Sequence, residues 1–451
     1  MKPISISVLT LVAAMLTAGC APSVNEAQLD QFITAHVEEV KPIARQAALA
    51  SWDAAGSGKA EDYDRQSELT LKIRQIYSDP ERFAFLRAAK KTAQITDPIL
   101  KRQLTVLHNG YLSNQIEPEL LTKIVDLGVE IEKNFSVFRG TIDGEKVTDS
   151  RIKGILKTAT NSAERKKAWL ASKQVGPVVA ADIIKLVNLR NQAAQKLGFE
   201  NYHTMSLATG EQDVKELDII FDELYKLTNL PYAQLKADLD KRLAANCSIG
   251  TRELMPWHYH DPFFQDTPLV YDVDLDAYYK DKDVKDLSIK FYAGIGLPVE
   301  SIIAKSDLYE RDGKNPHAFC TDIDKEGDVR ILCNLKNNES WMETQLHELG
   351  HAVYDKFHDR QVPWLLRKPV HPFTTEAVAM FFGRLSRNPA WMQQMLDLTD
   401  AQHADIEKVS DRYARLKQLI FARWAMVMFS FEKQLYADPD QDLNALWWKT
   451  V

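Results

Sequence analysis

The stretch "METQLHELGHAVYDKF", residues 342–357, sets two histidines four positions apart, with a glutamate directly after the first. Apolar residues recur along it with the three- and four-residue spacing of a helix that buries one face: Leu346, Leu349, Val353 and Phe357. On such a helix, residues four positions apart project from the same side. The stretch therefore predicts a helix that carries two imidazoles side by side.

The three polar residues of this helix have the composition of a catalytic zinc site. His347 and His351 can share one cation, while Glu348 lies beside the cation, where it can act as a base on water. Ser340 and Glu343 have the spacing of a capping box and predict that the helix begins there. The alternative is a surface helix with solvated polar residues, but a charged residue and two histidines beside a buried row are costly unless they interact with one another.

A third ligand is expected from the following stretch, "HPFTTEAVAMFFGRL", residues 371–385. Thr374 or Thr375 could cap a second helix, with Glu376 in its first turn. The apolar face of that helix would comprise Val378, Phe381, Phe382 and Leu385. If the two helices pack side by side, two histidines and Glu376 hold one Zn²⁺ per chain and leave a fourth tetrahedral position open for water. The alternative role of Glu376 is a carboxylate favoured by the helix dipole.

Most of the remaining chain has helical periodicity, for example in residues 164–199 and 213–247. The strand signal is a hairpin over residues 318–334, with a turn centred on Glu326-Gly327. The prediction is a mainly α protein with one small hairpin. That turn would place Cys320 and Cys333 opposite each other, so the two could form a disulfide in an oxidising compartment.

The N-terminal stretch "MKPISISVLTLVAAMLTAGCAPS", residues 1–23, is typical of an export signal. Its apolar run is too short to span a bilayer. Small residues before Cys20 resemble the lipobox of bacterial lipoproteins, which predicts removal of residues 1–19 and lipidation of Cys20; plain cleavage near Ala21 is the alternative. We expect an exported protein of the bacterial periplasm or cell envelope, attached to a membrane only through this lipid.

Composition narrows the range of partners. The chain has 451 residues, enough for a large core, and 56 basic against 63 acidic side chains give a net charge of −7. A mildly acidic surface argues against nucleic acid as a partner.

Several segments resemble the angiotensin-converting-enzyme family of peptidyl-dipeptidases. "HELGH" (347–351) and "HPFTTEA" (371–377) are similar to its zinc helix and glutamate helix, and "NPHAFCTDIDKEGDVRI" (315–331) to its active-site strand. "LVNLRNQAAQKLGFENYHTM" (186–205) is similar to its helix-rich N-terminal part, and "NALWWKTV" (444–451) to a Trp-Trp segment.

The resemblance implies an all-helical, two-lobed body with a deep cleft and the hairpin at the active site. It implies that residues 20–451 form a zinc metallopeptidase domain that hydrolyses short peptides. His347, His351 and Glu376 would be the zinc ligands and Glu348 the general base. His317 and Ala318 would contact the peptide substrate.

Three departures from the family pattern stand out. Met380 replaces an aspartate that orients a zinc histidine, and the family's paired cysteines do not fall on Cys320 and Cys333. After the Trp-Trp segment the family continues with a tyrosine, a histidine and a lysine, whereas this sequence stops at Val451, so we expect a domain without its C-terminal part. The tyrosines that could replace the missing transition-state donor are Tyr271, Tyr354 and Tyr413. The alternatives are a weakly active or inactive zinc-binding lipoprotein that binds peptides, or an oligopeptidase or carboxypeptidase.

Overall fold

The computed structural model describes residues 24–91, 94–268, 270 and 273–451. The described chain is mainly helical and its strands form two two-stranded hairpins, which confirms the expected fold class. The predicted signal segment, residues 1–19, and the lipidation site Cys20 lie outside the described residues. None of the described helices combines the length and the apolar character needed to cross a bilayer.

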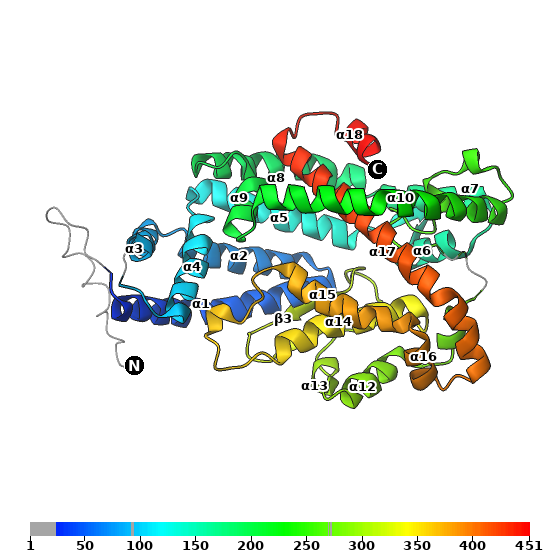
Figure 1. The fold of residues 1–451 in the computed structure, drawn as a ribbon. Coiled ribbons are helices and arrows are strands. Elements are labelled where there is room, and N and C mark those ends of the chain that lie inside the picture. Colours follow the sequence, from blue (N-terminus) through cyan, green and yellow to red (C-terminus); the bar gives the residue numbers. More distant parts are fainter. Residues whose placement is uncertain (1–23, 92–93, 269, 271–272) are drawn as a thin grey trace.

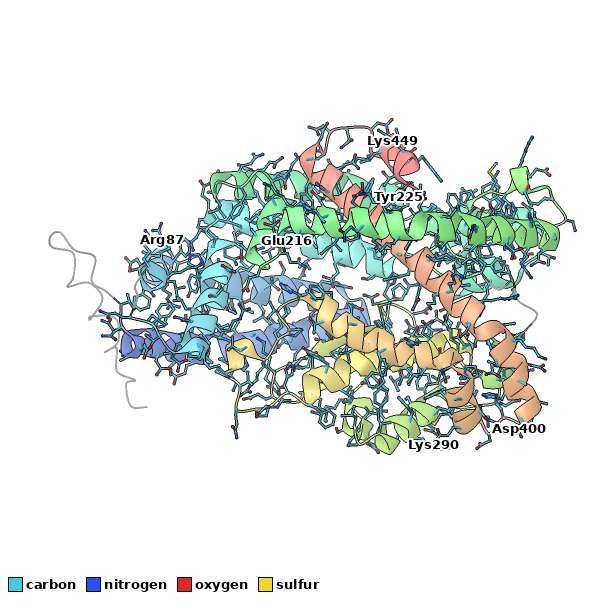
Figure 2. The ribbon with its side chains drawn as sticks, viewed as in Figure 1. Arg87, Glu216, Tyr225, Lys290, Asp400 and Lys449 are labelled. Atoms are coloured by element: carbon cyan, nitrogen blue, oxygen red, sulfur yellow. The ribbon has the colours of Figure 1, made fainter. Side chains whose placement is uncertain are left out.

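The helices fall into two groups in space (Figure 1), with α17 running obliquely from one to the other. One group lies at the top of the view and consists mainly of α5 (Pro118–Val137), α8 (Gly176–Lys196), α9 (Tyr202–Thr209) and α10 (Val214–Asn246). The other lies below and contains α12 (Val284–Gly294), α13 (Glu300–Ile303), α14 (Glu339–Lys356), α15 (Pro372–Gly383) and α16 (Pro389–Leu396). The remaining long helices are α1 (Glu26–Ser57), α2 (Ala60–Tyr77), α3 (Pro80–Lys91), α4 (Pro98–Leu112), α6 (Asp149–Thr158), α7 (Ser162–Lys173) and α17 (Asp400–Ala437). Two short helices complete the set, α11 (Asp276–Tyr279) and α18 (Leu443–Thr450). Figure 2 shows the side chains of these helices as sticks.

Helix α14 contains the histidine pair, and its N-cap lies two residues earlier than predicted. Asn338, not Ser340, is its cap, because the Asn338 side chain accepts a hydrogen bond of 2.9 Å from the N–H of Trp341. Leu346, Leu349 and Val353 are buried as expected. Phe357 instead follows the last turn of the helix and is 46% exposed.

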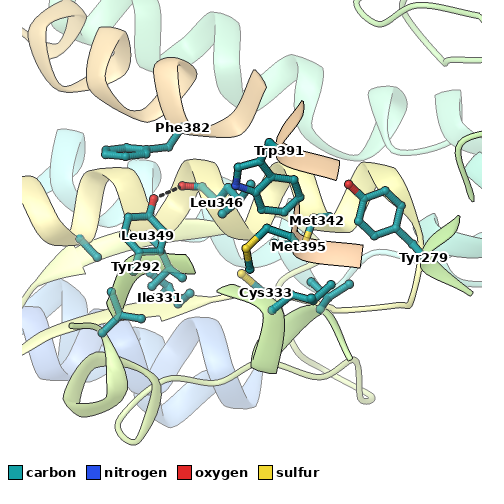
Figure 3. Packing of buried hydrophobic residues seen from close by; sticks show 14 of the residues in the cluster. Tyr279, Tyr292, Ile331, Cys333, Met342, Leu346, Leu349, Phe382, Trp391 and Met395 are labelled. Atoms are coloured by element: carbon teal, nitrogen blue, oxygen red, sulfur yellow. Dashed lines mark hydrogen bonds between the residues drawn. The ribbon is translucent and has the colours of Figure 1, made fainter. Parts of the chain in front are cut away.

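The buried face of α14 is the centre of the largest hydrophobic cluster (Figure 3). Met342, Leu346 and Leu349 pack there with Ile331 of the hairpin and Trp391 of α16. The buried Tyr292 of α12 donates its hydroxyl to the carbonyl of Leu346 at 2.7 Å. This packing fixes the position of α14 and leaves its other face available for the histidines.

A buried ionic network holds the first turns of α14. Glu339 accepts a hydrogen bond of 2.6 Å from Ser386 and pairs with Arg387 at 2.7 Å. Glu343 also pairs with Arg387, and with Lys417 of α17. Because Arg387 and Glu339 are almost completely buried, each depends on the other to remain charged.

The hairpin after α13 has a different register from the predicted one. Strand β3 (Phe319–Asp322) pairs antiparallel with β4 (Val329–Leu332), and Cys320 lies opposite Ile331. The predicted opposition of Cys320 and Cys333 is therefore wrong by two residues, and both thiols are free. The cause is the turn, which uses two left-handed residues, Lys325 at φ 57° and Gly327 at φ 111°, and is centred one residue earlier than Glu326-Gly327.

A second hairpin was not predicted. Strand β1 (Gly140–Ile142) pairs with β2 (Glu145–Val147) through a two-residue turn at Asp143 and Gly144, both with positive φ. Asp-Gly is the expected sequence for such a turn, so residues 143–144 carried a signal for this hairpin.

Helix α15 also differs in detail from the prediction. It begins at Pro372, and its preceding residue, His371, makes no side-chain cap. Neither Thr374 nor Thr375 caps it. Phe382 is buried on the α14 side, whereas Phe381 is 58% exposed and does not belong to the buried face.

Candidate metal centre

The structure brings the three predicted metal donors together. The Nε2 atoms of His347 and His351 are 3.2 Å apart. The Glu376 carboxylate lies 3.4 Å from Nε2 of His347 and 3.6 Å from Nε2 of His351. Within the described ranges this trio is the group of candidate metal-binding side chains whose donor atoms converge, all within 4.8 Å of one another.

The spacing of these atoms fits a tetrahedral ion. Two donors bound to zinc at their usual lengths in a tetrahedron are separated by about 3.3 Å. The three separations, 3.2, 3.4 and 3.6 Å, bracket that value. Two imidazoles and one carboxylate are also the donor set of zinc sites that leave a position for water.

Close contact between α14 and α15 creates this convergence. Gly350 lies between the two histidines on α14, and a β-carbon built on it would be 2.7 Å from the Cα of Ala379. A β-carbon on Gly383 would likewise be 3.3 Å from Cβ of His347. The absence of side chains at these two glycines lets the helices approach closely enough for Glu376 to reach the histidines.

The groups around Glu376 favour the ionised form of its carboxyl group, which is the form that binds a cation. The hydrogen bonds from His347 and His351 hold the pKa of the Glu376 carboxyl well below its ordinary value. Burial lowers the pKa of His351, but the hydrogen bond and charge of Glu376 outweigh it and raise that pKa above its ordinary value. The half-exposed carboxylate is therefore ionised, and it lies where a positive charge is favoured.

Glu348 has a different environment from Glu376. It is 7% exposed, and burial raises the pKa of its carboxyl, while the two neighbouring histidines oppose the rise. The backbone N–H of Cys320 in β3 donates a hydrogen bond to this carboxylate. Glu348 is therefore a fixed carboxylate beside the three donors but separate from them, which suits a proton acceptor.

The predicted substrate residues lie on the same hairpin. Directly after β3, the N–H of Ile323 donates to the carbonyl of Asp328 across the hairpin at 2.9 Å. By alternation, Cys320 of β3 and Ala318, which directly precedes the strand, direct their backbone groups to the opposite edge. The hydrogen bond from Cys320 to Glu348 confirms this direction. The backbone of Ala318 thus faces the edge on which Glu348 lies.

His317 is exposed and stacks on Phe135 of α5, with ring centroids 5.7 Å apart. Its backbone N–H donates to the side chain of Asn315 at 2.9 Å. His317 also lines a pocket of about 120 Å³. The apolar walls of this pocket include Phe138, Val147, Ile152 and Pro262, from the part of the chain that precedes the hairpin.

One site residue was missed by sequence reasoning. Nδ1 of His351 lies 2.8 Å from Oγ1 of Thr375, directly before Glu376. The sequence pattern predicts only a possible helix cap at Thr375. The signal was its position beside a predicted ligand, but identifying its partner required the relative placement of α14 and α15. Met380, at the position of the family aspartate, is 42% exposed, and the contact to His351 comes from Thr375.

The tyrosines predicted as possible hydrogen-bond donors to the transition state differ in burial and in contacts. Tyr413 is buried, with the Arg387 guanidinium 4.8 Å above its ring. Tyr354 is half-buried and follows His351 by three residues on α14, and its ring contacts His358. Tyr271 lies outside the described residues.

Comparison of this sequence with known proteins supports its family resemblance. The family model described as angiotensin-converting enzyme matches residues 23–259. The candidate donors, at 347–376, lie outside the matched segment. The chain is also 28% identical over 153 residues to oligopeptidase PepF of Bacillus subtilis (strain 168), a match that covers 32% of this chain and 21% of PepF. Because the family match spans more than half of the sequence, the chain belongs to the angiotensin-converting-enzyme family of metallopeptidases.

Proposed function

We propose that this chain is a zinc-dependent peptidase that hydrolyses peptide bonds in short peptides and releases dipeptides. The observation that carries the proposal is the position of Glu348. Its buried carboxylate is fixed beside three converging metal donors, yet it is not one of them. A site that only stores a metal does not need such a base.

Zinc is the metal that the donor set favours. His347, His351 and Glu376 offer two imidazoles and one carboxylate with spacing close to tetrahedral. When bound, zinc acts as a Lewis acid that polarises the scissile carbonyl and lowers the pKa of water to about 7.

Glu348 performs the proton transfers of the reaction. Its carboxylate removes a proton from the attacking water, and the oxygen adds to the scissile carbonyl. The carboxylic acid then delivers this proton to the nitrogen of the leaving amine as the C–N bond breaks. Burial raises the pKa of Glu348 toward the range in which a carboxyl group can both accept and return a proton. The N–H of Cys320 keeps the carboxylate oriented during both steps.

The edge of β3 gives this reaction a place for an extended peptide. The backbone N–H and C=O of Ala318 are directed to the edge on which Glu348 lies, and a peptide can pair with them as an added strand. His317, which directly precedes Ala318, lines the pocket described above, which suits a substrate side chain. Membership of the family supports the part of the proposal that the products are dipeptides.

The N-terminal sequence supports a location outside the cytoplasm. Residues 1–19 as an export signal, Cys20 as a lipidation site and residues 20–451 as one metallopeptidase domain are parts of this proposal. Mass spectrometry of the mature N-terminus after expression in a bacterial host tests them. A diacylglycerol-modified Cys20 supports the proposal, and a retained Met1 contradicts it.

Peptide digestion tests the activity itself. Unblocked peptides and the same peptides with amidated C-termini are incubated with the zinc-loaded protein, with and without a chelator, and the products are identified by mass spectrometry. We expect dipeptides from the unblocked set, lost on chelation and restored by zinc. One bound zinc per chain without any chelator-sensitive cleavage would instead show a binding protein, and release of single residues or internal fragments would show a different peptidase.

A further inference from the structure

His351 is held at both ring nitrogens by consecutive residues of α15. Its Nε2 faces the carboxylate of Glu376 at 3.6 Å, and its Nδ1 lies 2.8 Å from the hydroxyl of Thr375. Nε2 of His347 also faces Glu376, at 3.4 Å, and lies 3.2 Å from Nε2 of His351. Helix α15 therefore contacts both ring nitrogens of His351 through the adjacent residues Thr375 and Glu376.

The contact between Thr375 and His351 determines which ring nitrogen can bind a metal. A neutral imidazole that offers the Nε2 lone pair to a cation carries its proton on Nδ1. That proton needs an acceptor, and Oγ1 of Thr375 lies within hydrogen-bond distance. With Nδ1–H donated to Thr375, both the tautomer and the ring orientation of His351 suit a metal at Nε2.

The hydroxyl is not required by the helix itself. Helix α15 begins at Pro372, after an N-cap residue without a side-chain cap, and Thr375 donates to no backbone carbonyl among the bonds described for it. Thr375 is partly buried and contacts His351, whereas the adjacent Thr374 is exposed, so a substitution at Thr374 is a control for the same change at a neighbouring position of the helix.

We propose that Thr375 is a positioning residue of the metal centre, which orders His351 for binding through Nε2 and sets the affinity for the ion. The inference rests on the proposed zinc role of His351. Met380 stands where the family has an aspartate. The acceptor for Nδ1–H of His351 is then the neutral hydroxyl of Thr375 rather than a carboxylate. A neutral acceptor polarises the imidazole less, so the ligand is a weaker base.

Zinc affinity measured by competition with a chromophoric chelator tests this inference without reference to catalysis. Thr375→Val keeps the shape of the side chain but removes the acceptor, and we expect zinc binding about 10- to 100-fold weaker. Thr375→Ser restores the hydroxyl and should bind within about threefold of the unaltered protein. Thr374→Val is the control and should leave the affinity unchanged. Thr375→Ala repeats the test with a smaller side chain in case valine crowds the helix.

A spectroscopic readout separates positioning from a general structural effect. Cobalt(II) substituted for zinc reports ligand geometry through its visible absorption, which should change in Thr375→Val and return in Thr375→Ser. The melting temperature of the metal-free protein should be the same for Thr375→Val and Thr374→Val. Equal zinc affinity in Thr375→Val and the unaltered protein would overturn the role of Thr375 while leaving the peptidase proposal intact. An unaltered protein that binds no zinc would overturn both.

Discussion

Gly350 of α14 and Ala379 of α15 lie so close together that a β-carbon on Gly350 would be 2.7 Å from the Cα of Ala379. This contact sets the separation of the two helices, and therefore the distance from Glu376 to the histidines on either side of Gly350. A backbone atom blocks the added carbon, so the contact cannot be relieved by rotating a flexible side chain.

Gly350→Ala should therefore weaken both folding and metal binding. In an open helix the change would stabilise by about 0.5–1 kcal/mol, but here the steric conflict should cost about 1–3 kcal/mol and displace Glu376. Thermal unfolding and zinc titration measure the two effects. Gly128→Ala, in α5 with nothing within 4 Å of the new carbon, is the matched control and should not lose stability. Unchanged zinc affinity in Gly350→Ala would disprove the link between this contact and the site.

Glu348→Gln should separate catalysis from metal binding. The amide retains the shape of the side chain but cannot accept the proton of water, so peptide cleavage should fall by about 10²- to 10⁴-fold. Zinc should still bind at one equivalent, since Glu348 is not among the converging donors. Initial rates on one peptide and a zinc titration of the same preparation give both values. A variant that lost zinc, or kept full activity, would require another role for Glu348.

The thiols of the hairpin should remain unpaired in an oxidising compartment. Cys320 and Cys333 are not opposite each other, and burial raises the pKa of both thiols well above the ordinary value, which leaves little reactive thiolate. Alkylation after unfolding, without a reductant, should label Cys247, Cys320 and Cys333. A disulfide-linked peptide containing Cys320 and Cys333 would contradict the observed register.

Acid should destabilise the protein in part through His36. This histidine is 2% exposed and hydrogen-bonds the hydroxyls of Tyr111 and Tyr77; burial, aided by the charge of Arg82, lowers its pKa from 6.5 to about 4. Above pH 6.5 it is neutral in both states. Between pH 6.5 and 4 only the unfolded chain takes up the proton, so the free energy of unfolding should fall by about 3 kcal/mol as the pH falls through this range.

Urea unfolding at a series of pH values, on the unaltered protein and on His36→Gln, measures the contribution of this histidine. The glutamine variant will be less stable at every pH because it loses ring contacts, so the informative quantity is the slope between pH 6.5 and 4. Identical slopes in the two proteins would mean that His36 does not titrate as its burial requires.

Helix α14 and its histidine pair were predictable because both depend on local periodicity. Leu346, Leu349 and Val353 recur at the spacing of one buried face, and this local pattern determines on which side His347 and His351 lie. The approach of Glu376 also followed, because an apolar face on each helix requires the two to pack together. In these respects short-range sequence patterns were sufficient.

The predictions were wrong where two nearby residues can each cap the same helix, or where a contact joins segments that are distant in the sequence. Asn338 and Ser340 can both cap a helix, and tertiary pairing of Glu343 with Arg387 and Lys417 removes the glutamate that a cap at Ser340 would need. The hairpin register depends on left-handed backbone at Lys325, a residue with no sequence preference for it. The contact of Thr375 with His351 depends on the rotation of α15 about its axis, which periodicity specifies only coarsely.

We expect one zinc ion to bind among His347, His351 and Glu376. Anomalous diffraction at the zinc edge, on crystals of the protein with one equivalent of zinc, would locate that ion. We expect a single peak, with zinc about 2.0–2.1 Å from Nε2 of each histidine and about 2.0–2.2 Å from an oxygen of Glu376. A peak at other side chains, or a zinc ion held by the two histidines with the Glu376 carboxylate turned away, would contradict this expectation.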